Sequence, residues 1–209
     1  MRYVFIHGLG QKPSSWDKIV TLMRERVQAV CPDLSALMGD NEITYANLYR
    51  SFSDYCNGFA EPLNLCGLSL GCVLALNYGI DNPAKVQSLT LIAAQYQMPK
   101  MLLKIQNIIF KITPGSVFTK MGFQKKDFIA LTNSMTDLNF SGKLKDISCP
   151  CLILCGEKDG ANKKAAKGLA ENVKGADFHF IKNAGHEANE DNPDKLAELL
   201  LSFIKDKAD

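Results

Sequence analysis

The sequence predicts an α/β fold, with a mostly parallel sheet of about six strands and helices on both faces. Short apolar runs bounded by turn residues lack the polar alternation of a half-exposed sheet, so each run indicates a strand buried on both faces. Segments with helical spacing separate the runs, as parallel strands require. The strand candidates are, in chain order, residues 3–7, 28–32, 63–67, 88–94, 151–156 and 178–182.

The helices are predicted from apolar residues that recur every three or four positions. Residues 16–27 and 43–56 show this spacing, and a helix of small residues follows Ser69. The last helix has the clearest start, because Asn192 suits the N-cap and Pro193 the first helical position. Its apolar face then carries Leu196, Leu199, Leu200, Phe203 and Ile204.

Composition limits the classes of function. A chain of 209 residues with 46% hydrophobic and 22% charged residues fits one domain with a real core. A net charge of only +2 argues against a nucleic-acid partner. Seven cysteines without framework spacing indicate free thiols in a reducing compartment. The apolar run at the N-terminus is too short for a signal peptide, and no run reaches the roughly 18 residues of a membrane span, so we expect a cytoplasmic protein.

Residues 95–147 break the alternation of strands and helices. They predict about two helices and no strand, which we interpret as a helical lid inserted over the carboxyl edge of the sheet. The expected core is then formed by residues 1–94 and 148–209.

The lid segment is basic and contains one very apolar helix. Residues 95–145 hold eight lysines and two acids, a charge of +6 against −4 for the rest of the chain. Helix 99–112 carries one polar stripe of Lys100, Lys104, Asn107 and Lys111. Its fourteen residues rise only about 21 Å, too little to span a membrane.

Two interpretations of this helix stay open. It either packs on the sheet edge with solvated lysines, or forms a mobile lid whose apolar side lines an acyl pocket. In the second case Leu102 and Ile109 would contact substrate, and the lysines would meet an anionic substrate or lipid surface. Replacing Leu102 or Ile109 with Asp would then impair turnover of medium-chain esters more than of acetate.

A serine stands between two glycines, in Gly67-Leu68-Ser69-Leu70-Gly71, where a strand pattern changes into a helix pattern. A corner this tight strains the backbone of its central residue and leaves no room for side chains two positions away. It also presents the Ser69 hydroxyl at the sheet edge as a candidate nucleophile.

An acid and a base follow at later strand ends. Asp159 comes after the strand at 151–156, and His186 comes after the strand at 178–182. The order Ser69, Asp159, His186 is one known order for a catalytic triad. Two backbone N–H groups are expected to form the oxyanion hole, from Leu70 at the helix start and from Leu9 in the loop "HGLGQ".

These motifs together resemble the α/β-hydrolase-fold serine hydrolases. "HGLGQ" with "SSW" resembles the family's oxyanion loop, "VCPDL" its next strand end, and "CGLSLGC" its nucleophile elbow. "CLILCGEKD" resembles the acid-bearing strand and "NAGHEANEDNP" the histidine loop. The chain begins at what resembles the family's third strand, so the family's first hairpin is missing. Cys72 replaces a glycine that is frequent there.

Other residues could compete for these roles. Glu157 and Asp137 are alternative acids, whereas His7 suits a structural role in the oxyanion loop and His179 lies within a strand. Three cysteines share one strand face, at positions 149, 151 and 155, but without a histidine or fourth cysteine nearby we interpret them as buried hydrophobic residues. We expect no metal site, and the glycines of "HGLGQ" lack the pattern of a phosphate or dinucleotide loop, so no cofactor is expected.

The resemblance implies a cofactor-independent hydrolase of carboxylic esters, with a small-molecule ester as substrate. A thioesterase, or a carbon–carbon bond hydrolase or lyase with the same triad, is the second enzyme hypothesis. A ligand-binding receptor on the same fold is the hypothesis from a different class.

Overall fold

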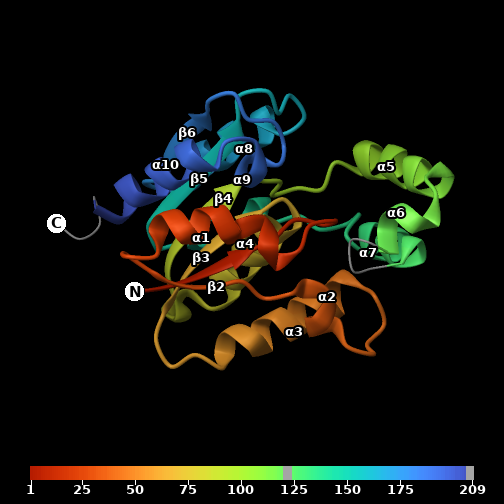
Figure 1. The fold of residues 1–209 in the computed structure, drawn as a ribbon, viewed down its shortest axis with the longest axis horizontal. Coiled ribbons are helices and arrows are strands. Elements are labelled where there is room, and N and C mark those ends of the chain that lie inside the picture. Colours follow the sequence, from red (N-terminus) through yellow and green to blue (C-terminus); the bar gives the residue numbers. More distant parts are fainter. Residues whose placement is uncertain (120–123, 206–209) are drawn as a thin grey trace.

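The computed structural model describes residues 1–119 and 124–205, apart from the side chains at positions 101, 102, 104–106, 109, 117 and 119. In this part of the chain six strands form one parallel sheet, in the order β2-β1-β3-β4-β5-β6 (Figure 1). The strands are β1 (Arg2–Ile6), β2 (Gln28–Val30), β3 (Leu63–Leu68), β4 (Val86–Ile92), β5 (Cys151–Gly156) and β6 (Asp177–Ile181). The predicted fold class and all six strand positions are confirmed.

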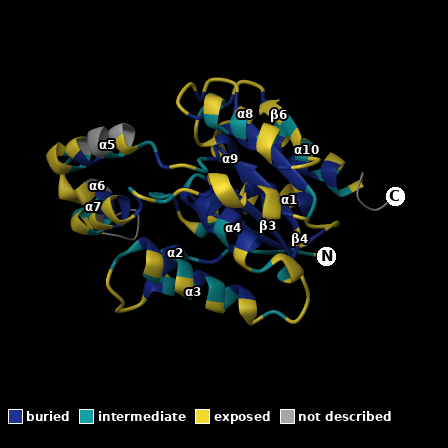
Figure 2. Ribbon diagram, turned by 180° about the vertical axis from the view of Figure 1, so that it is seen from behind, coloured by how far each residue is buried: buried dark blue, intermediate teal, exposed yellow. Residues whose placement is uncertain are grey.

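Side chains of each inner strand alternate between two apolar cores, one on each face of the sheet. In β1, Val4 and Ile6 join the core under α3 (Tyr45–Asn57), α4 (Leu70–Asp81) and α8 (Lys163–Asn172). Tyr3 and Phe5 join the core under α1 (Asp17–Met23) and α10 (Pro193–Lys205). Figure 2 shows the inner strands β1, β3, β4 and β5 buried between these helices. The edge strands β2 and β6 are mostly half-buried or exposed, so the prediction that every strand is buried on both faces is wrong for these two. Burial on both faces explains why the inner strands have continuous apolar sequences.

The helix starts follow from local hydrogen bonds. Asn192 caps α10 as predicted, since its Oδ1 accepts the backbone N–H of Lys195 at 3.2 Å. A short helix that the sequence analysis did not predict, α2 (Leu34–Met38), is capped by the carboxylate of Asp33. The remaining short elements are η1 (Pro13–Trp16), η2 (Pro83–Lys85), η3 (Ser141–Asp146) and α9 (Ala188–Asp191).

Three helices lie between β4 and β5, beyond the carboxyl edge of the sheet: α5 (Lys100–Ile112), α6 (Gly115–Thr119) and α7 (Lys125–Ser134). We call them the cap helices. The segments that lead into and out of them are hydrogen-bonded to each other, Met98 N–H to Leu138 C=O at 3.0 Å and Phe140 N–H to Tyr96 C=O at 2.8 Å. This pairing joins the cap helices to the sheet through a short two-stranded stem.

Helix α5 turns part of its polar stripe inward. Asn107 is buried, donates to Asn133 Oδ1 at 2.7 Å and accepts a hydrogen bond from Thr132. The side chains of Ile108 and Ile112 are instead 61% and 78% exposed. The exposed side chains of α5 that the structure describes are thus both apolar, Ile108 and Ile112, and basic, Lys100 and Lys111. None of the helices in the described part of the chain has the length and apolar character needed to cross a bilayer.

Candidate active site

Ser69 occupies the corner between β3 and α4, with φ 54° and ψ −111°. The glycines on either side are needed for close backbone approach. A Cβ atom on Gly67 would lie 2.2 Å from the carbonyl oxygen of Gly71, and one on Gly71 would lie 2.1 Å from that of Ile6. The sequence predicted that side chains two positions from Ser69 would have no room at this corner, and the structure confirms it.

The structure brings Ser69, His186 and Asp159 together in one chain of hydrogen bonds. The Ser69 hydroxyl lies 3.0 Å from His186 Nε2, and His186 Nδ1 lies 3.0 Å from Asp159 Oδ2. Because the carboxylate can only accept, Nδ1 carries the ring proton and the Nε2 lone pair faces the hydroxyl. This arrangement can remove a proton from Ser69.

Asp159 is only 5% exposed, so its charge depends on hydrogen bonds. Burial raises the pKa of this carboxyl, but hydrogen bonds from His186 and Asn162 outweigh burial and hold the pKa below its usual range. The amide of Asn162 donates to both carboxylate oxygens, at 2.9 and 2.8 Å. Asp159 is therefore ionised at neutral pH.

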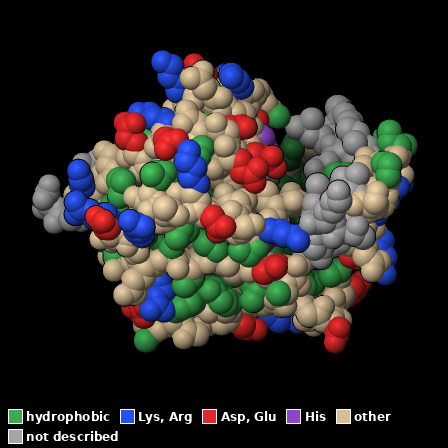
Figure 3. Space-filling model, viewed as in Figure 1, with side chains coloured by type: hydrophobic (Ala, Val, Ile, Leu, Met, Phe, Trp, Pro, Cys, Tyr) green, Lys and Arg blue, Asp and Glu red, His purple; other side chains and the backbone are tan. Residues whose placement is uncertain are grey.

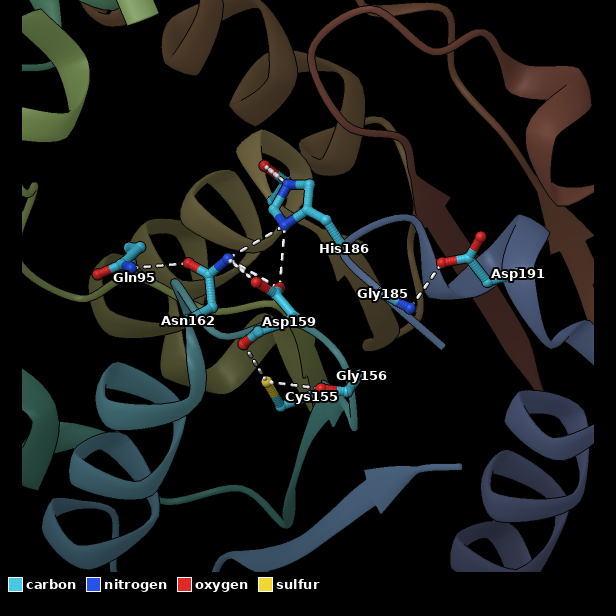
Figure 4. A network of polar contacts seen from close by, with 9 residues as sticks. Gln95, Cys155, Gly156, Asp159, Asn162, Gly185, His186 and Asp191 are labelled. Atoms are coloured by element: carbon cyan, nitrogen blue, oxygen red, sulfur yellow. Dashed lines mark hydrogen bonds and ion pairs between the residues drawn. The ribbon is translucent and has the colours of Figure 1, made fainter. Parts of the chain in front are cut away.

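The hydrogen bond to Asp159 raises the pKa of His186, against the opposing effect of burial. The loop that carries His186 is held by Asp191, whose carboxylate accepts the backbone N–H of Gly185 at 2.7 Å (Figure 4). A positioned imidazole with a raised pKa is a base that works above its own titration step.

The predicted oxyanion loop lies against Ser69. A Cβ atom on Gly8 would approach Ser69 Cβ to 3.5 Å. Leu9 and Leu70 line the same cavity as Ser69, and Leu70 is the first residue of α4, where backbone N–H groups have no acceptor within the helix.

His7 has the structural role proposed for it. Its Nδ1 donates to the Gly8 carbonyl at 2.9 Å, and its Nε2 accepts the Leu34 backbone N–H at 3.2 Å. Burial lowers the pKa of His7, which keeps the ring neutral and suited to both bonds.

Two buried amides that sequence reasoning missed connect the oxyanion loop to the histidine loop. Gln11 Oε1 accepts the Gly8 N–H at 3.2 Å, and Gln11 Nε2 donates to Asn189 Oδ1 at 3.1 Å. Asn189 follows His186 by about one helical turn, in α9. The hydrogen bond between Gln11 and Asn189 therefore connects the two loops that lie on either side of Ser69. Asn162 was missed as well, although its place three residues after Asp159, before a helix, was a usable signal.

A cavity of about 410 Å³ opens over the triad, between the core and the cap helices. Figure 3 shows the surface hollowed there. Besides the triad its lining is mostly apolar, with Leu9, Leu70, Val73, Met98, Leu103 and Met135. Leu103 comes from α5. The side chains of Leu102 and Ile109, which the sequence analysis assigned to substrate, lie outside the described part of the structure.

The competing residues have other partners. Glu157 accepts the Asn183 backbone N–H at 3.0 Å, and Asp137 pairs with Lys100 at 2.6 Å. His179 is exposed on the edge strand β6. Cys151 and Cys155 are buried in the core, and burial raises the pKa of Cys155 to about 11. Within residues 1–119 and 124–205 no three histidine, cysteine or acidic side chains are grouped so that they could hold a metal ion.

Comparison with known proteins adds independent information. A family model described as "Alpha/beta hydrolase family" matches residues 3–199. The monoacylglycerol lipase ABHD6 of Mus musculus is 26% identical over 163 residues, which cover 68% of this chain and 48% of that protein. The chain thus spans about half the length of this curated relative.

Two solved structures share the fold over nearly the whole chain. A thermophilic esterase from Thermogutta terrifontis has a TM-score of 0.83 at 17% identity, covering 99% of this chain and 90% of that one. NosK from Streptomyces actuosus has a TM-score of 0.85 at 18% identity, covering 100% and 99%.

Proposed function

The chain belongs to the alpha/beta hydrolase family, and from this premise we propose that it cleaves a carboxylic ester through an acyl-enzyme on Ser69. The observation that carries the proposal is the unbroken chain of hydrogen bonds from Ser69 through His186 to Asp159, at the base of an apolar cavity. The curated relative named as a monoacylglycerol lipase and the similar esterase structure support ester hydrolysis.

In the proposed reaction, His186 accepts a proton and returns it in each of two steps, acylation and deacylation of Ser69. His186 Nε2 takes the hydroxyl proton while Ser69 Oγ attacks the acyl carbon, and the N–H groups of Leu9 and Leu70 stabilise the resulting oxyanion. His186 then returns the proton to the departing alkoxide, so an alcohol leaves and an acyl-serine remains. A water that gives its proton to His186 then attacks the acyl carbon. As the bond between this carbon and Ser69 Oγ breaks, His186 returns the proton to Oγ, so the acid leaves and the free serine is restored.

The pH dependence of kcat/KM tests the base. His186 must be neutral to accept a proton, and its pKa is raised above the ordinary value of about 6.5. We therefore expect kcat/KM to be full at alkaline pH and to fall through a single step above pH 6.5 as the pH is lowered. A profile between pH 5 and 9 measures this. His179→Ala, on the exposed edge strand, should leave the profile unchanged, whereas flat activity from pH 5 to 8 would contradict the role of His186.

We propose an apolar acyl group of medium length as substrate, because the lining of the cavity is apolar, and we propose that the cap helices act as a lid over it. Leu103→Ala should lower kcat/KM for p-nitrophenyl octanoate about tenfold more than for the acetate, since only the longer chain reaches this side chain. A panel of p-nitrophenyl esters measures the ratio. Ile108→Ala, on the exposed side of the same helix, is the matched control; equal losses on both esters would refute the acyl assignment.

The outer side of α5 supports a further proposal, a peripheral contact with an anionic lipid surface. Exposed Ile108 and Ile112 are accompanied by the exposed Lys111 in a basic segment, and Figure 3 shows hydrophobic side chains at this end of the cap helices. Apolar side chains bordered by lysines fit the interface of an anionic bilayer.

Vesicle binding tests this contact. Ile108→Asp should weaken co-sedimentation with vesicles containing phosphatidylserine about tenfold, because an isoleucine no longer enters the lipid, and leave hydrolysis of soluble esters unchanged. Leu22→Asp replaces an exposed leucine on α1 and should have no effect. Equal binding of the wild-type protein and Ile108→Asp would exclude this surface.

A further inference from the structure

Asn162 lies between the acid and the end of the strand that precedes the cap helices. Its side chain is buried, with 7% of the residue exposed, directly before α8. Its Nδ2 donates to Asp159 Oδ1 and Oδ2, and its Oδ1 accepts from Gln95 Nε2 at 2.7 Å. Figure 4 shows these side chains as one connected network, from Gln95 through Asn162 and Asp159 to His186.

The orientation of the Asn162 amide is determined by its two neighbours. A carboxylate can only accept hydrogen bonds, so the NH₂ group of Asn162 faces Asp159. The carbonyl oxygen of Asn162 then accepts the hydrogen bond from the Gln95 amide. Asn162 Nδ2 also lies 3.1 Å from His186 Nδ1, but both atoms are donors when Nδ1 carries its proton. This contact is then not a hydrogen bond, and any effect of Asn162 on His186 passes through Asp159.

We propose that Asn162 is a positioning residue that holds the carboxylate of Asp159 in the plane where Oδ2 accepts the Nδ1 proton of His186. The Asp159 carboxylate can rotate about its Cβ–Cγ bond. Because Asn162 Nδ2 donates to both of its oxygens, it restrains this rotation. Gln95 in turn prevents the amide from flipping. This inference rests on the proposed serine hydrolase mechanism.

The charged and titratable groups nearby do not duplicate this role. Glu187 and Asp191 raise the pKa of His186 from its own loop, and the carboxylate of Asp191 is bound to the Gly185 N–H. Lys163 lowers the pKa of Cys155, whose thiol lies 4.0 Å from the backbone carbonyl of Asp159. Within the described residues, the side chains of Asn162 and His186 donate hydrogen bonds to the Asp159 carboxylate, and the backbone N–H of Asn162 makes a smaller contribution.

Asn162→Ala should lower kcat about 10- to 100-fold with little change in KM, the loss expected for a hydrogen bond to a charged group. The step in the pH profile should move down toward the ordinary histidine value, because the bond to Asp159 is what raises it. Asn172→Ala removes an exposed asparagine at the other end of α8 and should change neither quantity.

The outcomes separate positioning from mere support of the fold. A kcat within twofold of wild type, or a step that stays in place or moves upward, would overturn the proposal, since the carboxylate would then still face His186 without Asn162. If Asn162→Ala does not fold, Gln95→Ala releases the same amide and should shift the profile in the same direction.

A readout without substrate separates this inference from the proposed function. The proton on His186 Nδ1 should give a low-field NMR signal that moves upfield in Asn162→Ala. An unchanged signal would refute positioning by Asn162. A shifted signal in a protein that hydrolyses no ester would refute the proposed substrate class alone.

Discussion

Ser69→Ala should lower kcat/KM for short p-nitrophenyl esters by at least ~10⁴-fold, because in the proposed mechanism Ser69 forms the acyl-enzyme and neither His186 nor Asp159 can replace it. The thermal midpoint should stay nearly unchanged. The hydroxyl bonds to His186 on the cavity side and contributes little to core packing, and the residue keeps the same backbone conformation. Steady-state kinetics and thermal unfolding measure the two quantities. Ser202→Ala, at an exposed position on α10, is the control and should match wild type in both.

Labelling with a fluorophosphonate distinguishes the classes of function that share this site. Rapid labelling that is lost in Ser69→Ala and retained in Ser202→Ala would identify the nucleophile. Labelling of Ser69 without turnover of any ester, thioester or diketone would favour a ligand-binding receptor. Activity retained by Ser69→Ala would contradict the serine hydrolase mechanism.

The sheet could be predicted because burial on both faces leaves a direct trace in the sequence. In β5 the residues Cys151–Gly156 are all buried, and the sequence there is correspondingly apolar without alternation. The short helix α2 left a weaker trace, since five residues do not complete two turns. Its signal was the capping residue, Asp33, followed by Leu34, Leu37 and Met38 at helical spacing.

The positions of Ser69, Asp159 and His186 followed from strand ends, which parallel strands bring to one edge of the sheet. The bonds between loops could not be predicted in the same way. Gln11 and Asn189 are far apart in the sequence, and no spacing rule pairs two amides across a fold.

The orientation of α5 could not be predicted for a related reason. Its sequence shows a polar stripe, but whether the stripe faces water depends on the neighbouring helix. Thr132 and Asn133 on α7 satisfy Asn107, so a polar residue is buried while Ile108 is exposed.

Asp159→Asn should lower kcat about 10⁴-fold, an effect as large as that expected for the nucleophile. The reason lies in the amide of Asn162, which can only donate toward position 159. The new amide must turn its oxygen to Asn162, so its NH₂ group faces His186. Nδ1 would then have to accept, the ring proton would move to Nε2, and that nitrogen could no longer take the proton of Ser69.

The neighbouring acid provides the matched control for this change. Glu157 lies two residues before Asp159, and its carboxylate accepts the Asn183 N–H instead of contacting His186. Glu157→Gln keeps an acceptor for that bond, so kcat should stay within about threefold of wild type. Steady-state kinetics on the same ester compares the two variants. If Glu157→Gln were inactive and Asp159→Asn active, the acid of the triad would have to be reassigned, because the tautomer of His186 would then depend on the other carboxylate.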